Sequence, residues 1–333
     1  MKRTILILAL LIPMLSTQAQ RWKQYRYDLF FGLGTTNFMG DLGGGGADAS
    51  HFLGVRDLDG AATRPSFHAG MRYKIFENMT VRGQIFYGFL NGSDERSGSY
   101  GRQNRNLSFY SPLMEASSQI EYHFIKEKIS SRYQISAGLR NLLSAYVFVG
   151  VGGFYFNPKA LGPDGNWYEL QPLGTEGQGH VTQYKDKDSV LVKVPNPYKR
   201  FQLAIPMGIG AKYTINRYWS IGMELSNRYT TTDYIDDVSN RYFNFYEAVD
   251  KGWISGTYEN YAVHSVFSDR HIHITDYNTN TTIEPGDPDW EENRYESGKR
   301  FRGSPDYNDS YMMLNITLYR KLSSTRSGLP KFK

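Results

Sequence analysis

Cysteine is absent from the 333 residues of this chain. The fold therefore contains no disulfide and no cysteine-ligated metal, and packing and hydrogen bonding must stabilise it. Long apolar runs are also scarce: after residue 19 the longest, near residues 145–156, is broken by three glycines. A membrane-spanning helix needs about 20 consecutive apolar residues, so this sequence argues against a helical membrane protein. Aromatic residues are abundant, at 15% of the chain, and together with the scarcity of apolar runs they favour an exported β-rich protein.

The N-terminus has the pattern of a secretory signal peptide. Lys2 and Arg3 precede an apolar stretch of about eleven residues that ends in small and polar residues up to Ala19, which is too short to span a bilayer as a helix. We expect residues 1–19 to be the signal peptide and residues 20–333 to form a single domain. Gln20 follows the expected cut, which excludes a lipidated cysteine there. The mature chain carries 38 − 2 = 36 basic and 33 acidic residues, and this small excess gives no support for nucleic-acid binding.

Eight segments alternate apolar with small or polar residues, the period expected of strands whose successive side chains point to opposite faces. The expected strands lie at residues 26–40, 66–75, 79–90, 112–125, 144–156, 200–215, 219–228 and 310–322.

The connections between these segments decide between a soluble sandwich and a membrane barrel. Long and short connections alternate, and the long ones cover about residues 41–63, 91–107, 157–199 and 232–308. Short periplasmic turns and long extracellular loops produce this pattern. We therefore expect an all-β fold, an eight-stranded antiparallel transmembrane outer-membrane β-barrel with long extracellular loops. Aromatic residues expected to form an interfacial girdle toward the short turns are Tyr25, Tyr27, Tyr73, Phe76, Tyr122, Phe124, Tyr213, Tyr218, Trp219 and Tyr319.

The inward face of such a barrel is expected to carry a polar network. An eight-stranded barrel is just wide enough inside for its own side chains, so mutually neutralising charges would plug it. A proton or ion pathway is the alternative interpretation. The charged residues and the histidine predicted to face inward are Arg72, Lys74, Arg82, Glu121, His123, Lys212, Glu224 and Arg228.

Several stretches carry a family resemblance. "YELQPLGTEGQG" at 168–179, "RFQLAIPMGIGAKYTINRYWSIGMEL" at 200–225 and "TDYIDDVS" at 232–239 resemble the PorG-like outer-membrane barrel family of Bacteroidota, as do "FFGLGTTNFMGDLGG" at 30–44 and "YMMLNITLYRKL" at 311–322. The resemblance implies an outer-membrane component of the type IX secretion system, associated with a periplasmic ring of PorK and PorN proteins. It implies no catalytic residues.

The residues themselves also predict a non-enzymatic protein without a cofactor, metal or small-molecule substrate. The nucleophile-elbow, phosphate-loop and zinc-protease motifs are missing. A lipid-A-modifying barrel enzyme is one alternative, but His264 and Ser265 are adjacent in a long loop and His68 and His123 alternate onto the inward face. A surface barrel whose long loops bind a ligand is another alternative.

Three groups of possible metal ligands remain open. His271 and His273 lie two residues apart on one face of a strand, or in a solvated loop. The acidic runs Asp233, Asp236, Asp237 and Asp287, Asp289, Glu291, Glu292 offer oxygen ligands for calcium, or are solvated loops. For the first acidic run a third interpretation is a turn whose carboxylates accept backbone N–H groups.

Basic residues collect on the expected periplasmic side. They are candidates for contact with an acidic periplasmic ring protein, or for contact with anionic headgroups of outer-membrane lipid. The residues expected to face a partner are Arg132, Arg140, Arg320, Lys321 and Arg326.

The glycine- and proline-rich stretch 156–179 is expected to be an ordered outer cap over the barrel mouth rather than a flexible linker. Asn157-Pro158 should end strand pairing, because proline has no N–H to donate. The cap residues singled out are Trp167, Tyr168, Glu169, Leu170 and Glu176. The apolar residues are expected to pack the turns, and Glu169 or Glu176 to pair with inward arginines near the rim.

Overall fold

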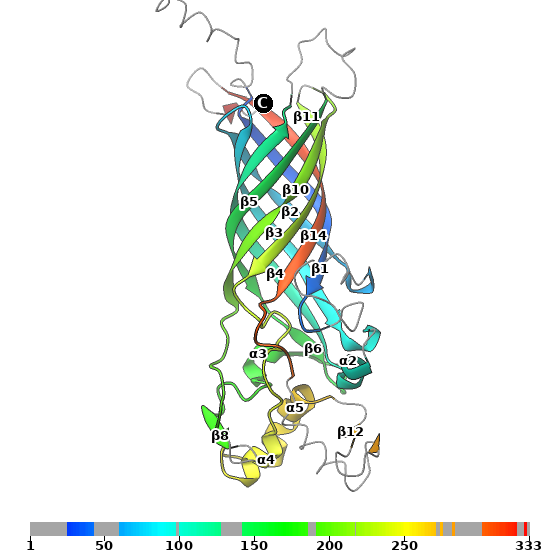
Figure 1. Ribbon diagram of the computed structural model, residues 1–333, viewed down its shortest axis with the longest axis vertical. Helices are drawn as coiled ribbons and strands as arrows, with labels where there is room; N and C mark the ends of the chain where they lie inside the picture. The colour runs from blue at the N-terminus through cyan, green and yellow to red at the C-terminus, as the bar shows by residue number, and fades with distance from the viewer. Residues whose placement is uncertain are drawn as a thin grey trace, which may run out of the picture.

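A computed structural model describes residues 25–42, 60–97, 100–127, 142–185, 191–216, 218–270, 274–275, 282–283, 302–324 and 330–331. The expected signal peptide lies outside these ranges. Eight long antiparallel strands dominate the described chain (Figure 1). They are β1 Tyr27–Met39, β2 Arg64–Lys74, β3 Met79–Ser93, β4 Ser108–Ile125, β5 Leu143–Phe156, β10 Phe201–Thr214, β11 Trp219–Thr230 and β14 Ser310–Ser324.

The sheet closes on itself. Strands pair in the order β1-β2-β3-β4-β5-β10-β11-β14, and β14 pairs back with β1. Leu33, for example, lies opposite Phe67 of β2 and Ile316 of β14. The predicted eight-stranded antiparallel barrel is confirmed, and closure leaves none of these eight strands with an unpaired edge.

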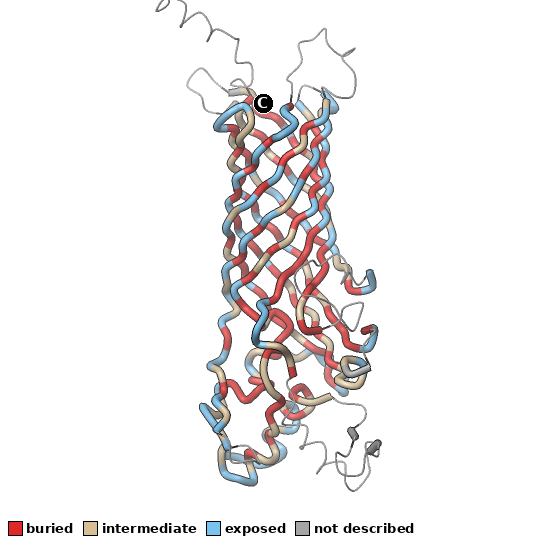
Figure 2. The backbone as a smooth tube through the Cα atoms, in the orientation of Figure 1, coloured by how far each residue is buried: buried red, intermediate tan, exposed pale blue. Residues whose placement is uncertain are grey.

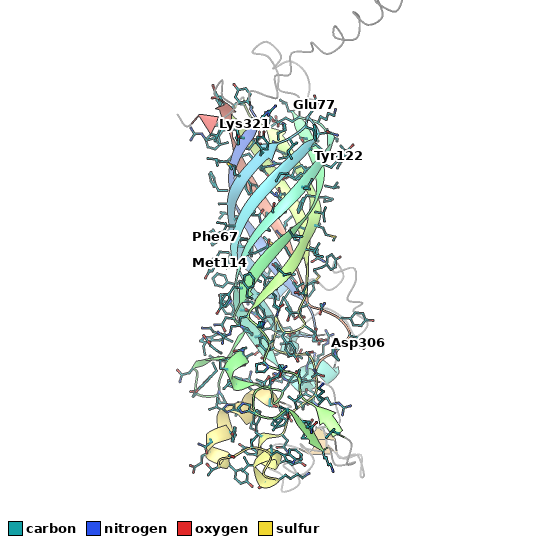
Figure 3. The ribbon with its side chains drawn as sticks, turned by 90° about the vertical axis from the view of Figure 1, so that its left-hand side faces the viewer. Phe67, Glu77, Met114, Tyr122, Asp306 and Lys321 are labelled. Atoms are coloured by element: carbon teal, nitrogen blue, oxygen red, sulfur yellow. The ribbon has the colours of Figure 1, made fainter. Side chains whose placement is uncertain are left out.

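The two faces of the barrel wall differ as the alternation predicts. Apolar side chains point outward and remain exposed, including Leu33 at 62% and Ile85 at 65%, whereas polar and aromatic side chains point inward. Figure 2 shows this alternation of buried and exposed residues along each strand, and Figure 3 shows Phe67 and Met114 projecting from the outer wall. An apolar exterior around a polar interior is the arrangement of a transmembrane barrel.

Short turns lie at one end of the barrel and long loops at the other. Residues 75–78 join β2 to β3, and residues 215–218 join β10 to β11, at the end where the chain terminates in Figure 1. Phe76, Tyr122, Phe124 and Tyr218 are exposed near this end. The prediction that Tyr319 joins this girdle is wrong: it is fully buried inside the barrel.

Apart from β15, which pairs with β14 at the short-turn end, the remaining elements lie in the long loops, which extend beyond the opposite end of the barrel (Figure 1). No helix among the described residues is long and apolar enough to cross a membrane. The helices are η4 Gly60–Ala62, η5 Asp94–Arg96, α2 Tyr100–Arg105, α3 Leu170–Leu173, α4 Phe245–Asp250 and α5 Tyr258–Ser268. The short strands are β6 Lys159–Leu161, β7 Trp167–Glu169, β8 Gln183–Lys185, β9 Leu191–Lys193, β12 Ile274–Thr275, β13 Thr282–Ile283 and β15 Pro330–Lys331.

A hydrophobic layer joins the loops to the barrel mouth. Phe154, Phe156 and Met313 of the wall pack in one cluster with Ile235 and other loop residues. Rings also stack across the junction, from Phe156 to Tyr198 at 6.0 Å and from Tyr198 to Tyr234 at 4.8 Å between centroids. We call the loop residues 157–199, 231–270 and 302–309 that cover this end the cap. A second, smaller cluster of Phe243, Phe245, Ala248 and Ile254 forms a distal lobe of the cap.

Candidate functional site

The middle of the lumen holds two buried carboxylates surrounded by cations. Glu121 of β4 pairs with Arg72 of β2 and lies 3.3 Å from both Arg82 Nε and His123 Nε2. Glu224 of β11 accepts from Arg82 Nη1 at 2.6 Å. Each carboxylate therefore has a cation across the lumen, which offsets much of the cost of burying it.

Tyrosine hydroxyl groups complete this middle layer. Tyr146 and Tyr319 both donate to Glu224 Oε1, and Arg72 stacks over their two rings at 5.0 and 4.8 Å. Gly210 makes room for Tyr146, because a Cβ at this glycine would lie 2.5 Å from the Tyr146 ring. A strand position without a side chain is thus needed for the tyrosine to reach across the lumen.

A second layer lies at the short-turn end of the lumen, around Glu127. Its carboxylate pairs with Lys321 and lies 3.0 Å from Lys212 Nζ and 3.8 Å from Lys74 Nζ. Lys212 also lies 3.4 Å from Asp28 Oδ2. This end of the lumen is therefore closed by two carboxylates and three ammonium groups.

A third layer lies toward the cap, around Glu115. Its Oε2 accepts from Tyr311 Oη at 2.7 Å and from Arg228 Nε at 3.3 Å. The hydrophobic layer under the cap follows directly, since Tyr311 belongs to it as well. Tyr311 therefore belongs both to the third polar layer of the lumen and to the hydrophobic cluster under the cap.

These layers close the described lumen to bulk solvent. Arg72, Arg82 and Arg228 are each 1% exposed, and Glu121 and Glu115 are fully buried. Six cationic side chains (Arg72, Lys74, Arg82, Lys212, Arg228, Lys321) face five carboxylates (Asp28, Glu115, Glu121, Glu127, Glu224). A filled interior with nearly balanced charge suits a plug better than an ion pathway, for which a continuous hydrated route lined by charge would be needed.

All eight residues predicted to face inward lie buried in the barrel, and the three layers include every one of them. Sequence reasoning missed Asp28, Glu115 and Glu127, and did not assign a network role to Tyr146, Tyr311 and Tyr319. The signal for Glu115 was available, because it shares the parity of Glu121 and His123 on one strand.

Of the residues expected to face a periplasmic partner, the structure describes two, one pointing outward and one pointing into the barrel. Arg320 is exposed and its guanidinium lies 5.7 Å from the centroid of the Trp219 ring. Lys321 is a correction: it points inward, is 5% exposed and pairs with Glu127, so it does not present its charge to a partner. Alternation along β14 explains the difference, since Lys321 has the parity of inward Asn315 and Thr317. Arg132, Arg140 and Arg326 lie outside the described residues.

The expected cap stretch is ordered but only partly as predicted. Leu170 is buried in the junction cluster, and Tyr168 packs against it with its ring 5.3 Å from Phe267. Trp167 is a correction, because it is 57% exposed and faces away from that cluster. It lies in β7, which pairs with β6 and continues the barrel sheet beyond β4, so alternation turns it to the outer side.

The two glutamates of this stretch have partners. Glu169 Oε2 lies 2.9 Å from Nη2 of Arg200, the residue before β10, and Glu169 Oε1 lies 3.4 Å from Lys159 Nζ. Glu176 pairs with Arg302 of the longest loop at 3.4 Å, so the prediction of an inward barrel arginine is wrong for this residue. Burial raises the pKa of Glu176 to about 7, although Arg302 opposes the shift.

Arg302 joins the separate loops of the cap. Its guanidinium donates to Thr175 Oγ1 at 3.0 Å and to the Phe267 carbonyl at 3.1 Å, and it lies 3.5 Å from Asp237 Oδ2. The side chain is 2% exposed. Three segments of the cap therefore share one buried cation, and each depends on the others for charge balance.

Four aspartates form a second buried group at the base of the cap, on the side of β1 and β14. Asp236 accepts from the backbone N–H groups of Leu42 at 3.1 Å and Val238 at 3.0 Å, and Asp309 accepts from that of Ile235 at 2.8 Å. Asp41 accepts from Ser304 N at 2.7 Å. This agrees with the interpretation of "DYIDDVSN" as a turn that captures backbone N–H groups, and not with a solvated loop.

Burial and mutual repulsion change the titration of this group, which we call the aspartate cluster (Asp41, Asp233, Asp236 and Asp309). Burial raises the pKa of Asp233 to about 8, and the neighbouring Asp41 adds to the shift. Burial, with repulsion from the other carboxylates, also raises the pKa of Asp236 and of Asp309 well above the usual range. Within the described chain, no three acidic or histidine residues are arranged to hold a metal ion.

His68, His123 and His264 each contact neighbouring side chains of the protein. His68 Nε2 lies 2.9 Å from Thr317 Oγ1 and His123 Nδ1 lies 2.9 Å from Ser144 Oγ, both inside the barrel rather than on its lipid-facing wall. His264 packs in the distal lobe, 5.2 Å from the ring of His180. His271, His273 and the acidic run 287–292 lie outside the described residues.

Comparison with known proteins gives one family match and several distant structural likenesses. The family described as "Domain of unknown function (DUF6089)" matches residues 168–268. None of the curated proteins matches the chain.

Three solved structures illustrate the likenesses. OprG from Pseudomonas aeruginosa is 8% identical with a TM-score of 0.34, over 90% of this chain and 98% of that one. Ail, the attachment invasion locus protein of Yersinia pestis, is 7% identical with a TM-score of 0.33, over 90% and 98%. A major outer membrane protein from Thermus thermophilus is 11% identical with a TM-score of 0.33, over 88% and 99%. These likenesses are too distant to bear on function.

Proposed function

We propose that this protein is a non-enzymatic outer-membrane barrel of the type IX secretion system that anchors or organises a periplasmic ring of the PorK/PorN type. The observation that carries the proposal is the filled lumen. Arg72, Arg82 and Glu121 cross-link its middle layer and are closed to bulk solvent. A barrel whose lumen is filled along its length can act at the membrane through the molecules that its two ends bind, and not by transporting a solute through the lumen.

The sequence resemblance supports the choice of machinery. The stretches at 168–179, 200–225 and 232–239 that resemble PorG-like barrels all fall within residues 168–268, the region matched by the DUF6089 family. In the structure these stretches form the end of β7 with α3 and the turns that follow it, β10 with the first part of β11, and the turn of the aspartate cluster. The resemblance thus covers both wall and cap.

The short-turn end offers a surface for the ring. Phe76 and Ile215 at the tips of two turns are 57% and 55% exposed, and Tyr218 is 50% exposed. Glu77 and Lys126 form an exposed ion pair beside them at 3.2 Å. Exposed apolar groups with a charged surround are typical of a protein contact, and Arg320 lies at the same end.

Co-purification with a matched variant tests this proposal. A tagged barrel extracted in mild detergent is expected to bring down the ring lipoprotein and its partner, identified by mass spectrometry. Phe76→Glu with Ile215→Glu should lower that recovery by about tenfold or more, because two apolar contacts of about 1 kcal/mol each would be replaced by charges. If the wild-type barrel purifies alone, and a deletion strain still secretes type IX cargo, the proposal fails.

A surface-binding barrel is the second candidate, and the cap favours it. The distal lobe has its own apolar cluster, and beside it a cavity of about 240 Å³ is lined by Glu176, Tyr184, Asn240 and Arg241 among others. Replacing residues 158–198 and 233–307 with short turns separates the two functions. Ring co-purification should survive the exchange if the barrel is a scaffold, whereas capture of an external ligand would be lost.

A further inference from the structure

The β6–β7 hairpin extends the barrel sheet on one side only. Lys159 of β6 pairs with Tyr110 of β4, just beyond the point where β5 ends opposite Leu113. Trp167 of β7 then lies opposite Leu161 of β6. The hairpin is therefore a continuation of the transmembrane wall past the barrel mouth, and not a loop separated from it.

The inner face of this hairpin is packed and its outer face is not covered by the described chain. Ala160 is buried and Tyr168 is half-buried, both against the junction cluster under the cap. On the outer face Trp167 is 57% and Leu161 is 44% exposed. Exposed apolar side chains that adjoin a larger apolar surface mark a contact with a membrane or with another protein.

A continuous row of aromatic rings connects this outer face to the lipid-facing wall. The rings of Tyr87 and Phe89 are 5.2 Å apart, those of Phe89 and Tyr110 are stacked at 5.4 Å, and those of Tyr110 and Trp167 are 5.8 Å apart. Tyr87 lies between Phe67 and Met114 in the strand register, and Figure 3 shows these two side chains on the outer wall. The row thus runs from the membrane surface of the barrel onto the hairpin.

The length of β4 sets the depth of this row. Ten residues separate Tyr122, near the short turns, from Pro112. At about 3.4 Å per residue and a tilt of about 40°, they span roughly 26 Å along the barrel axis, which equals the apolar band of about 25 Å of an outer-membrane barrel. Tyr110 lies two residues beyond Pro112, roughly 5 Å further by the same geometry, and is therefore at headgroup level.

The side chains on the outer face of the hairpin suit the headgroup level of the membrane. Lys159 and Glu169 form an ion pair at 3.4 Å on the same outer face, with both side chains partly exposed. Tryptophan and tyrosine beside charged groups are the residues that favour the boundary between headgroups and acyl chains. The hairpin tip at Gly165, with a φ of 79°, turns the chain back in a polar, exposed Asp164–Asn166 segment.

We propose that the outer face of the β6–β7 hairpin is a lateral membrane anchor for the cap. Trp167 and Leu161 lie at the headgroup boundary of the outer leaflet, and Tyr110 joins them to the lipid-facing wall. The cap is thereby attached to the membrane on the β3–β4 side as well as to the barrel mouth. This anchoring is independent of any ring or ligand that the protein binds.

Depth-dependent fluorescence quenching tests the anchor. A full-length variant that keeps Trp167 but has Trp22, Trp219, Trp253 and Trp290 replaced by phenylalanine is placed in phosphatidylcholine vesicles. Lipid brominated near the headgroup end of the acyl chains should quench Trp167 more strongly than lipid brominated near the terminal methyl, and aqueous iodide should quench it weakly. The matched variant that keeps only Trp253, in the distal lobe, should respond to iodide and not to brominated lipid.

The opposite result overturns the proposal. If iodide reaches Trp167 as readily as Trp253 and brominated lipid leaves it unchanged, the face is open to water or awaits a protein. Should the multiple variant fail to fold, wild type and Trp167→Phe are compared directly. The component quenched by lipid brominated near the headgroup must then be smaller in Trp167→Phe, and an unchanged component contradicts the anchor.

Discussion

Replacing Glu121 with glutamine is expected to lower the free energy of unfolding of the barrel by about 3–5 kcal/mol. Arg72 and Arg82 both pair with this carboxylate and are each 1% exposed. Glutamine keeps the shape but removes the charge, so two guanidinium groups would share the remaining carboxylate, Glu224, in a site closed to bulk solvent. Removing one member of a buried ion pair lowers the free energy of unfolding far more than removing one member of a solvated pair, because the other charge stays buried.

Urea unfolding in phospholipid vesicles, followed by tryptophan fluorescence, measures this loss, and Glu77→Gln is the matched control. Glu77 pairs with Lys126 at the short-turn end, but both side chains are about half exposed. Its replacement should change the free energy of unfolding by at most about 1 kcal/mol. Equal effects of the two substitutions would mean that water reaches the middle of the lumen, and the plugged barrel would be wrong.

Raising the pH is expected to loosen the cap through the aspartate cluster. Asp233, Asp236 and Asp309 have raised pKa values in the folded cap, with that of Asp233 at about 8. Between about pH 4 and pH 8 the folded cap therefore holds protons that the unfolded chain has released. Their stabilising contribution is complete below the unfolded pKa and is lost as the pH rises through the folded values.

Asp309→Asn should shift this loss to higher pH. Asparagine can still accept from the Ile235 N–H, but it removes one of the mutually repelling charges, which should stabilise the cap by roughly 1–2 kcal/mol at alkaline pH. Hydrogen exchange at the Leu42 and Val238 amides, both bonded to Asp236, reports the opening.

Wild type and variant are compared at the same pH so that intrinsic exchange rates cancel. Asp306→Asn is the control, since Asp306 is exposed in the same loop, as Figure 3 shows, and this change should leave exchange unaltered. The Leu42 and Val238 amides could instead exchange equally fast in wild type and Asp309→Asn at alkaline pH. That result would mean that repulsion between the carboxylates does not destabilise the cap.

Much of the barrel could be predicted because each strand and its two faces are determined by neighbouring residues in the sequence. Alternation on eight segments gave the number of strands, their faces and the inward position of residues such as Arg82 and Glu224. The same rule could have placed two residues that were assigned otherwise. Tyr319 and Lys321 share the parity of Asn315 and Thr317, and this parity outweighs the general preference of aromatic and basic residues for the membrane boundary.

The cap could not be predicted to the same depth, because its contacts join residues far apart in the chain. Arg302 reaches Thr175 and Glu176, more than 120 residues away, and Asp41 reaches Ser304. Neither pairing leaves a periodic signal in the sequence. The outward turn of Trp167 depended on β6 pairing with β4, which glycine and proline content alone does not indicate.

Single-channel recording tests the central claim, a plugged barrel that holds rather than transports. The purified full-length protein, inserted in a planar lipid bilayer in concentrated potassium chloride, is expected to give no steps of conductance above the bare bilayer at either polarity. Glu121, Glu127 and Glu224 would remain paired with their cations across the lumen. Stable, ohmic channels that scale with the amount of inserted wild-type protein would contradict the account.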